Sequence, residues 1–228
     1  MADVLTGCEG IDYRTQRKDK AKELLEAKYH EEFEVELYEG QQILQKYYTV
    51  TAYSREYPDL LFEAGIPAEG DVFSDGYAAK RIALTISDRI SQNLDGVQGL
   101  YLVYSELMVD QLTEASPDMS IEEFAGQNPS NKVTVNIFLA PEEIGASELY
   151  QKISKSLEGV SGISGILRLY IIDEEQLGKI EEYTSTHVKL YGDFKELTEG
   201  KMVFSADYSD SVINMTEDEF VSSVGEYL

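Results

Sequence analysis

The sequence predicts an α+β fold in which a mostly antiparallel sheet is covered by helices on one face. Apolar and polar residues alternate at 33–38 and 133–139, a pattern typical of half-buried strands. Apolar residues repeat every four positions over 82–94, which predicts an amphipathic helix. Strands follow one another directly in the first half of the chain, as in an antiparallel meander, whereas strands and helices alternate in the second half.

In the first half we expect a helix, three strands, a second helix and a fourth strand. The expected ranges are 15–30, 33–38, 46–54, 60–64, 75–94 and 99–104. Tyr57-Pro58-Asp59 predicts a turn before the third strand. Ser74 is the expected N-cap of the second helix. The apolar stripe of that helix consists of Ile82, Ile86, Ile90 and Leu94.

In the second half we expect three strands and three helices in alternation. The expected ranges are 133–139, 147–157, 166–172, 174–184, 202–208 and 217–227. Asp173 and Thr216 each begin a capping-box pattern, which marks a helix start. The strand–helix–strand order fits either a parallel crossover or a split βαβ unit.

The segment 110–131 is the candidate boundary between two small α+β lobes, because Pro, Gly and polar residues interrupt the periodic pattern there. One helical turn is expected inside it, at 121–124. The first lobe would cover residues 15–110 and the second 131–228, after a signal remnant and tether at 1–14. A single domain is the alternative, since the length of 228 residues does not choose between the two.

The charge balance restricts the possible partners. The chain has 43 acidic residues against 19 basic ones, for a net charge of −24. Proteins that bind nucleic acids present clustered Lys and Arg to the phosphates, so no nucleic acid partner is expected. The chain also has no run of 18 apolar residues that would predict a transmembrane helix.

The single cysteine, Cys8, directly follows Leu5-Thr6-Gly7. This pattern resembles the lipobox of bacterial lipoproteins, in which the cysteine sulfur takes a diacylglycerol and the signal peptide is cut just before it. The resemblance implies an extracytoplasmic protein held at the membrane through the lipid on Cys8 only. The apolar part of the signal peptide would then lie upstream of Met1. The basic stretch from Arg14 to Lys22 would lie near anionic headgroups.

A second resemblance lies in residues 26–35, which read Glu-Ala-Lys-Tyr-His-Glu-Glu-Phe-Glu-Val. The part from Lys28 to Val35 is similar to a helix-to-strand segment of small uncharacterised lipoproteins of Firmicutes, where Gly usually stands at the position of His30. This resemblance implies a layout and a bacterial group, with no activity attached.

No residue pattern indicates catalysis, a metal or a cofactor. His30 and His187 stand beside no nucleophile motif, and zinc sites need Cys/His clusters. The chain also lacks a phosphate-binding loop. We therefore expect no catalytic residues, no metal, no cofactor and no enzyme. A hydrolase that uses a pair of carboxylates is the enzymatic alternative, and two buried acids facing each other in a deep pocket would identify it.

The sequence contains 16 tyrosines and no tryptophan. Tyr47, Tyr48, Tyr53 and Tyr57 concentrate on one expected hairpin, where alternation places Tyr47 and Tyr53 on one face and Tyr48 on the other. Because tyrosine is enriched at recognition surfaces, these four residues form the candidate binding surface. The alternative is that they pack one face of the sheet under a helix.

These observations favour an extracytoplasmic, non-catalytic domain that binds a protein, a peptide or an envelope component. Its functional surface is expected away from residue 8, on the sheet or in the groove between the two lobes. The alternative is a cytosolic acidic interaction protein, such as an immunity protein or a nucleic-acid mimic that binds a basic partner.

Overall fold

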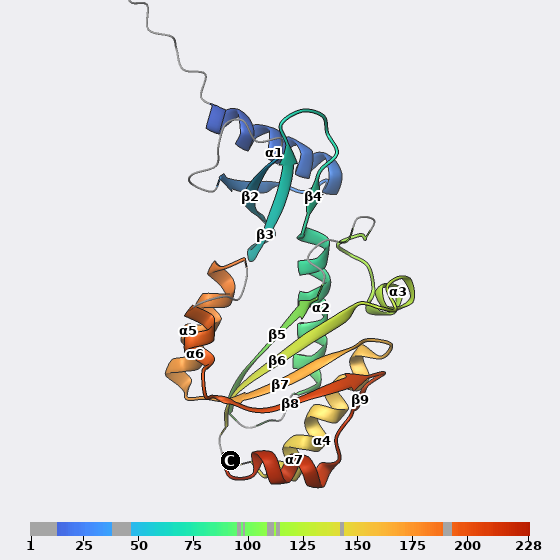
Figure 1. The fold of residues 1–228 in the computed structure, drawn as a ribbon, viewed down its shortest axis with the longest axis vertical. Coiled ribbons are helices and arrows are strands. Elements are labelled where there is room, and N and C mark those ends of the chain that lie inside the picture. The colour runs from blue at the N-terminus through green and yellow to red at the C-terminus, as the bar shows by residue number, and fades with distance from the viewer. Residues whose placement is uncertain are drawn as a thin grey trace, which may run out of the picture.

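The computed structural model describes residues 13–37, 47–94, 97, 99–108, 112, 115–141, 144–188 and 193–228. It contains two sheets, one of four strands and one of five, together with seven α-helices (Figure 1). All strand pairs except one are antiparallel. The expected α+β fold with mostly antiparallel sheets is therefore confirmed.

The four-stranded sheet and one helix form the small lobe. Its elements are α1 (Tyr13–Tyr29), β1 (Phe33–Leu37), β2 (Tyr47–Ser54), β3 (Tyr57–Pro67) and β4 (Ser74–Asp75). The strands are hydrogen-bonded in the order β1-β2-β3-β4. Alternate residues of β2 and β3, including Val50 and Phe62, are fully buried with Leu25 of α1. The helix therefore covers one face of this sheet, as the sequence predicts.

Two boundaries in the small lobe differ from the expected ones. Tyr57-Pro58-Asp59 belongs to β3, and the turn lies directly before it, at Arg55 and Glu56. Ser74 forms β4 with Asp75, and α2 begins after Gly76. In both places the pairing of strands prevails over the local preference of proline and serine for turns and caps.

The five-stranded sheet forms the large lobe. Its elements are α2 (Tyr77–Asn93), β5 (Gly99–Leu107), α3 (Ile121–Gln127), β6 (Lys132–Pro141), α4 (Ala146–Leu157), η1 (Glu158–Val160), β7 (Ser164–Ile171), α5 (Glu174–Thr186), α6 (Asp193–Thr198), β8 (Met202–Ser209), β9 (Val212–Ile213) and α7 (Glu217–Val224). The strand order is β5-β6-β7-β8-β9. The β6 and β7 strands are parallel neighbours, so α4 lies in a parallel crossover.

Helices cover both faces of the five-stranded sheet, whereas the sequence analysis expected them on one face. Val133 and Val135 of β6 belong to the core that includes α2, α4 and α7. Phe138 and Tyr170 point to the opposite face and pack with Phe194 of α6 and with α5. The central strands β6 and β7 carry large apolar residues on both faces, and each face therefore needs its own cover.

The first sheet ends with β4 and the second begins with β5, so the boundary between the lobes lies between these two strands. The segment 110–131, the boundary expected from the sequence, instead connects β5 and β6, two adjacent strands of one sheet. Turn-forming residues there mark a connection, but they carry no information on which strands pair across it. The structure confirms the expected helix inside this segment as α3.

The first residue of α2 joins the two lobes. The ring of Tyr77 lies 4.9 Å from that of Tyr29 and 5.1 Å from those of Phe33 and Phe62, so it completes the aromatic core of the small lobe. Asp75, which is 5% exposed, accepts hydrogen bonds from the Tyr77 backbone N–H and the Tyr29 hydroxyl. The opposite face of α2 packs on the five-stranded sheet, so a single helix belongs to both cores.

Candidate functional site: a groove between the lobes

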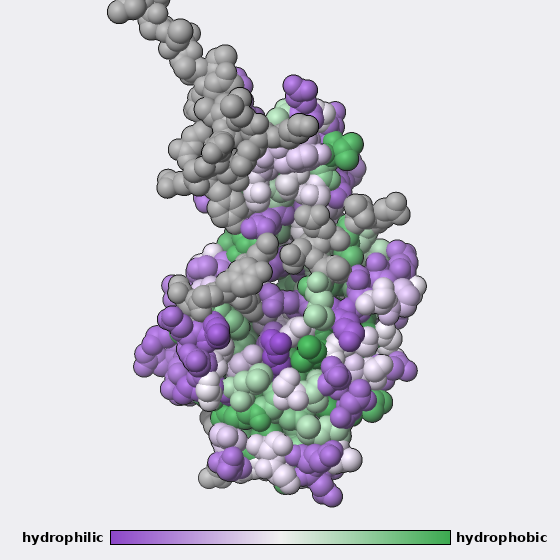
Figure 2. All heavy atoms as spheres, in the orientation of Figure 1, coloured by the Kyte–Doolittle hydropathy of each residue, from purple (hydrophilic) through white to green (hydrophobic). Residues whose placement is uncertain are grey.

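A groove of about 560 Å³ lies between β3, α2, β5 and α5. We call it the interlobe groove, because β3 belongs to the small lobe and the other three elements to the large lobe. The groove is lined, among others, by Asp59 and Leu60 of β3, Leu84, Ser87 and Asp88 of α2, Leu102, Val103 and Ser105 of β5, and Glu181 of α5. Figure 2 shows hydrophilic side chains gathered over α5 and α6, at the flank of the large lobe.

The buried stripe of α2 determines which of its residues reach the groove. Ile82, Ile86 and Ile90 are fully buried against the sheet, as the sequence predicts. Leu84 and Asp88 lie on another face of the same helix and line the groove. The sequence signal for this site is Leu84, an apolar residue that stands outside the predicted stripe.

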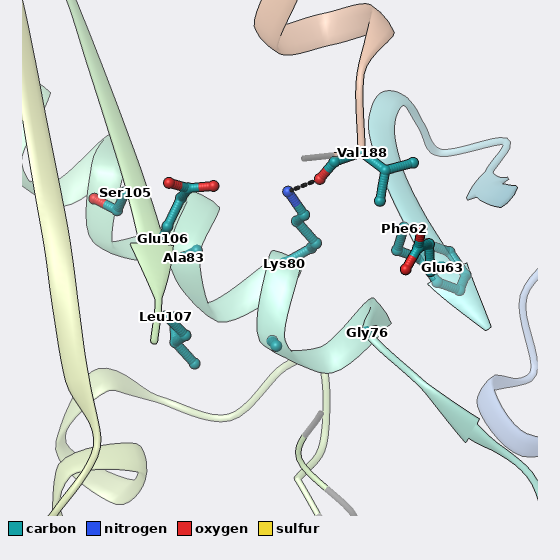
Figure 3. A pocket seen from close by; sticks show the side chains of 10 residues that line it. Phe62, Glu63, Gly76, Lys80, Ala83, Ser105, Glu106, Leu107 and Val188 are labelled. Carbon is teal, nitrogen blue, oxygen red and sulfur yellow. Dashed lines mark hydrogen bonds between the residues drawn. The ribbon is translucent and has the colours of Figure 1, made fainter. Parts of the chain in front are cut away.

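A cavity of about 60 Å³ adjoins the groove at Lys80 (Figure 3). Lys80, Ala83 and Ser105 line both spaces. The Lys80 ammonium donates to the Val188 carbonyl oxygen at 2.8 Å and to the Tyr104 hydroxyl at 3.2 Å. These bonds connect α2 to β5 and to Val188, two residues after the end of α5, so the lysine fixes the end of the groove.

Two titratable groups of the groove have shifted pKa values. Burial raises the pKa of Tyr104, and the nearby charge of Glu106 raises it further. Tyr104 is therefore a neutral phenol, and its hydroxyl oxygen accepts a hydrogen bond from the Lys80 ammonium. Partial removal from water raises the pKa of Asp88, which keeps solvent contact on one side.

The groove combines acidic and apolar surfaces. Asp59, Asp88 and Glu181 contribute carboxylates, and all three are exposed. Among the described residues that line the groove and the adjoining cavity, Lys80 is the one cationic side chain. A complementary ligand would therefore present basic groups to the carboxylates and apolar groups to the leucines.

One polar side chain in the wall of the groove has no hydrogen-bond partner. The Ser105 side-chain oxygen is buried and has no hydrogen-bond partner, and the residue as a whole is only 4% exposed. Its backbone N–H donates to the Ser87 hydroxyl at 2.8 Å. Since buried polar atoms are nearly always paired in folded proteins, this hydroxyl is one of the few exceptions among the described residues.

A second space of about 560 Å³ lies on the five-stranded sheet beside α6. Asn136, Arg168 and Ser205 occupy paired positions on β6, β7 and β8 and form a polar row across it. Lys195 of α6 and Glu199, which directly follows α6, contribute charges of both signs. This space has no unpartnered buried side chain among the described residues, so we regard the interlobe groove as the stronger candidate.

The four tyrosines of the candidate binding surface lie in different environments. Tyr48 is 2% exposed and donates from its hydroxyl to the Arg17 carbonyl oxygen at 3.0 Å, so it belongs to the core under α1. Tyr57 lies beneath the Arg81 guanidinium. Tyr47 is 62% exposed and shares the other face of β2 with half-buried Tyr53. A binding role for Tyr47 and Tyr53 stays a prediction.

Cys8 and the lipobox-like residues lie outside the described residues, so lipidation stays a prediction. In the basic stretch that follows, the Arg17 guanidinium lies 4.8 Å from the Tyr48 ring centroid, and the Lys20 ammonium donates to the Pro67 carbonyl oxygen at 3.0 Å. Lys18 is exposed. At least two of these bases therefore stabilise the small lobe, in addition to any contact with headgroups.

The described residues contain no group of three or more His, Cys, Asp or Glu side chains placed to hold a metal ion. No helix among them is long and apolar enough to cross a bilayer. The buried carboxylate of Asp75 forms an ion pair with Lys28 at 2.7 Å, which gives it a structural role.

The fold and the groove define a two-lobed α+β protein whose lobes share one helix. A solved structure with the same architecture is that of a DUF5037 family protein from Ruminococcus gnavus ATCC 29149, a Firmicute. The two match with a TM-score of 0.69 and 16% sequence identity over 91% of this chain and 98% of that one. This likeness shows the fold alone. No protein-family model and no curated protein matches the sequence.

Proposed function

We propose that this protein is a non-catalytic binding domain that holds a protein or peptide partner in the interlobe groove. The observation that carries the proposal is the groove itself, about 560 Å³ in volume and lined by β3, α2, β5 and α5. Peptides commonly bind in grooves or along exposed sheet edges, where pockets and charged side chains of the receptor give specificity. The leucines and carboxylates of the interlobe groove fit that description.

We also propose that the domain is extracytoplasmic and is anchored by a lipid on Cys8. This part rests on the likeness of Leu5-Thr6-Gly7-Cys8 to a lipobox. The first described residue, Tyr13, begins α1 in the small lobe, at the end of the molecule opposite to α7 (Figure 1). An anchored small lobe would leave the groove on the side away from the attachment point.

Site-specific photo-crosslinking in the native cells tests the binding proposal. A photoreactive residue in place of Leu84 lies in the groove, and the same residue in place of Val72, which is 87% exposed, is the matched control. We expect a discrete cross-linked partner from position 84 and none from position 72. Equal cross-linking from the two positions, or none from position 84, would contradict the proposal.

Mass spectrometry of the protein from its native cells tests the anchor. The expected N-terminal residue is a diacylated or triacylated Cys8. An unmodified N-terminus at Met1 or Ala2 would contradict the lipid anchor and favour a cytosolic acidic interaction protein. The groove would remain a binding site in that case, so the two halves of the proposal are tested separately.

A further inference from the structure

The β5 strand forms one end of the five-stranded sheet. Among the described residues its only strand partner is β6, which leaves its other edge without a neighbouring strand. That edge lies in the interlobe groove, with α2 on one side and α5 on the other. An unpaired strand edge is a ready template for an additional strand.

The hydrogen bonds of β5 show which residues point away from β6. The Ser105 N–H donates to Ser87 of α2, so the backbone of Ser105 faces the groove. The Met108 N–H donates to the Lys132 carbonyl oxygen, so the backbone N–H and C=O groups at the even-numbered positions of this strand face β6. Because the two orientations alternate in an antiparallel pair, the N–H and C=O of Val103 also face the groove.

The contact between Ser87 and Ser105 limits where a further strand can pair. Ser87 occupies the space beside the N–H of Ser105, so pairing can begin at Val103 and continue toward Gly99. The Ser105 hydroxyl is itself buried, so the added segment would pair through main-chain groups from Val103 onward.

The two walls of the groove show which side chains the segment would carry. In an extended segment, successive side chains point to opposite sides. Leu84 of α2 and Leu102 of β5 provide apolar contacts, and Asp88 of α2 and Glu181 of α5 provide negative charge. A segment that carries both apolar and basic side chains satisfies these surfaces.

We infer that the occupant of the groove is an extended segment of a partner protein, with both apolar and basic side chains, which adds as a strand to the unpaired edge of β5. The inference rests on the proposed binding function and identifies the chemical class of its ligand. Strand addition takes its affinity from main-chain hydrogen bonds and its specificity from the side-chain contacts.

Titration of the purified protein with a short capped peptide of alternating valine and lysine, followed by NMR, tests the inference. We expect slower hydrogen exchange of the Val103 amide and shifts in the signals of Leu84 and Leu102. Methylation of the peptide nitrogens that face β5 should weaken binding at least about tenfold, because it removes main-chain donors. A peptide that alternates valine and glutamate should not bind.

Charge-reversal variants inside and outside the groove test whether its acidic residues attract the basic peptide. Asp88→Lys and Glu181→Lys should each weaken the lysine peptide about tenfold. Asp71→Lys, the same charge reversal at an exposed position outside the groove, should leave its affinity unchanged.

Three results would overturn the inference. One is unchanged exchange at Val103 while the leucine signals shift, which would leave the groove as a binding site without strand addition. Another is equal affinity for the N-methylated peptide. The third is no binding of the lysine peptide at millimolar concentration. Failure of the proposed function itself would appear elsewhere, as absent cross-links from position 84 in cells.

Discussion

The guanidinium of Arg81 lies 3.8 Å from the centroid of the Tyr57 ring and so connects α2 to the small lobe. The same guanidinium donates to the Tyr77 hydroxyl at 3.1 Å and to the Asp118 carboxylate at 2.9 Å. The side chain of Arg81 is only 12% exposed. One cation therefore contacts the small lobe, the start of α2 and the segment before α3, and it holds the two lobes in a fixed relation.

Replacement of Arg81 by methionine tests this connection. We expect a loss of about 2–3 kcal/mol in the free energy of unfolding, because the change leaves polar groups at the lobe junction without their cation. Urea denaturation measures it. Arg55→Met is the control, since Arg55 forms exposed ion pairs with Glu32 and Glu34 and should change stability little. Equal losses in the two variants would contradict a special role for Arg81.

His30 predicts a stabilising substitution. His30 directly follows α1, and its φ of 59° lies in the left-handed region. Its N–H donates to the Glu26 carbonyl oxygen at 2.9 Å. Glycine adopts this conformation without strain. We expect His30→Gly to raise the free energy of unfolding by about 0.5–1 kcal/mol. His187→Gly should give no gain, since the φ of His187 is −125° and its ring stacks on Tyr183.

Replacement by alanine should have opposite effects on the stability of the protein at two glycines. A Cβ on Gly165 of β7 would lie 1.8 Å from the Val133 carbonyl oxygen, so Gly165→Ala should cost about 3 kcal/mol or prevent folding. A Cβ on Gly178 inside α5 would meet no atom within 4 Å, and Gly178→Ala should stabilise the protein by about 0.5–1 kcal/mol. Thermal unfolding of the two variants compares them directly. A stable Gly165→Ala protein would show that the backbones are farther apart than the structure places them.

Asp88 predicts a pH-dependent effect on stability. Its pKa is raised in the folded protein, so the folded state disfavours the carboxylate at neutral pH and this cost disappears once the carboxyl is protonated. Asp88→Asn should therefore stabilise the protein by about 0.3 kcal/mol at pH 7, a small value because Asp88 keeps solvent contact. The gain should vanish below about pH 4, near the pKa of an unfolded aspartate. A gain that grows as the pH falls would contradict the sign.

The elements that follow strong periodic patterns could be predicted from the sequence. The stripe of α2 and the capping boxes of α5 and α7 are found where the residues predict them. The two-residue strands β4 and β9 could not be predicted, because such short segments show no periodicity and exist only through their pairing partners. The sequence does not reveal the turn at Arg55 and Glu56, because cross-strand pairing sets its position.

The groove illustrates what local patterns omit. It brings Leu60 of β3 together with Glu181 of α5, which are far apart in the sequence. Their proximity depends on the order of strands in the five-stranded sheet and on the attachment of α2 to both lobes. A functional surface on the sheet or in a groove between lobes was expected from the sequence, but no residue pattern predicted which side chains line it.

The most direct test of the account is the accessibility of the groove in living cells. The sequence has one cysteine, Cys8, and the proposed lipid on its sulfur would block reaction with maleimide. A cysteine introduced as Leu84→Cys or Val72→Cys can then be followed with a membrane-impermeant maleimide. If the domain is extracytoplasmic, as we propose, the exposed Val72→Cys should react as fast on intact cells as in the purified protein. If a partner occupies the groove, Leu84→Cys should react at least about tenfold more slowly on cells than when purified. Equal slowing of the two positions would contradict an occupied groove, and no labelling of Val72→Cys on intact cells would contradict the extracytoplasmic location.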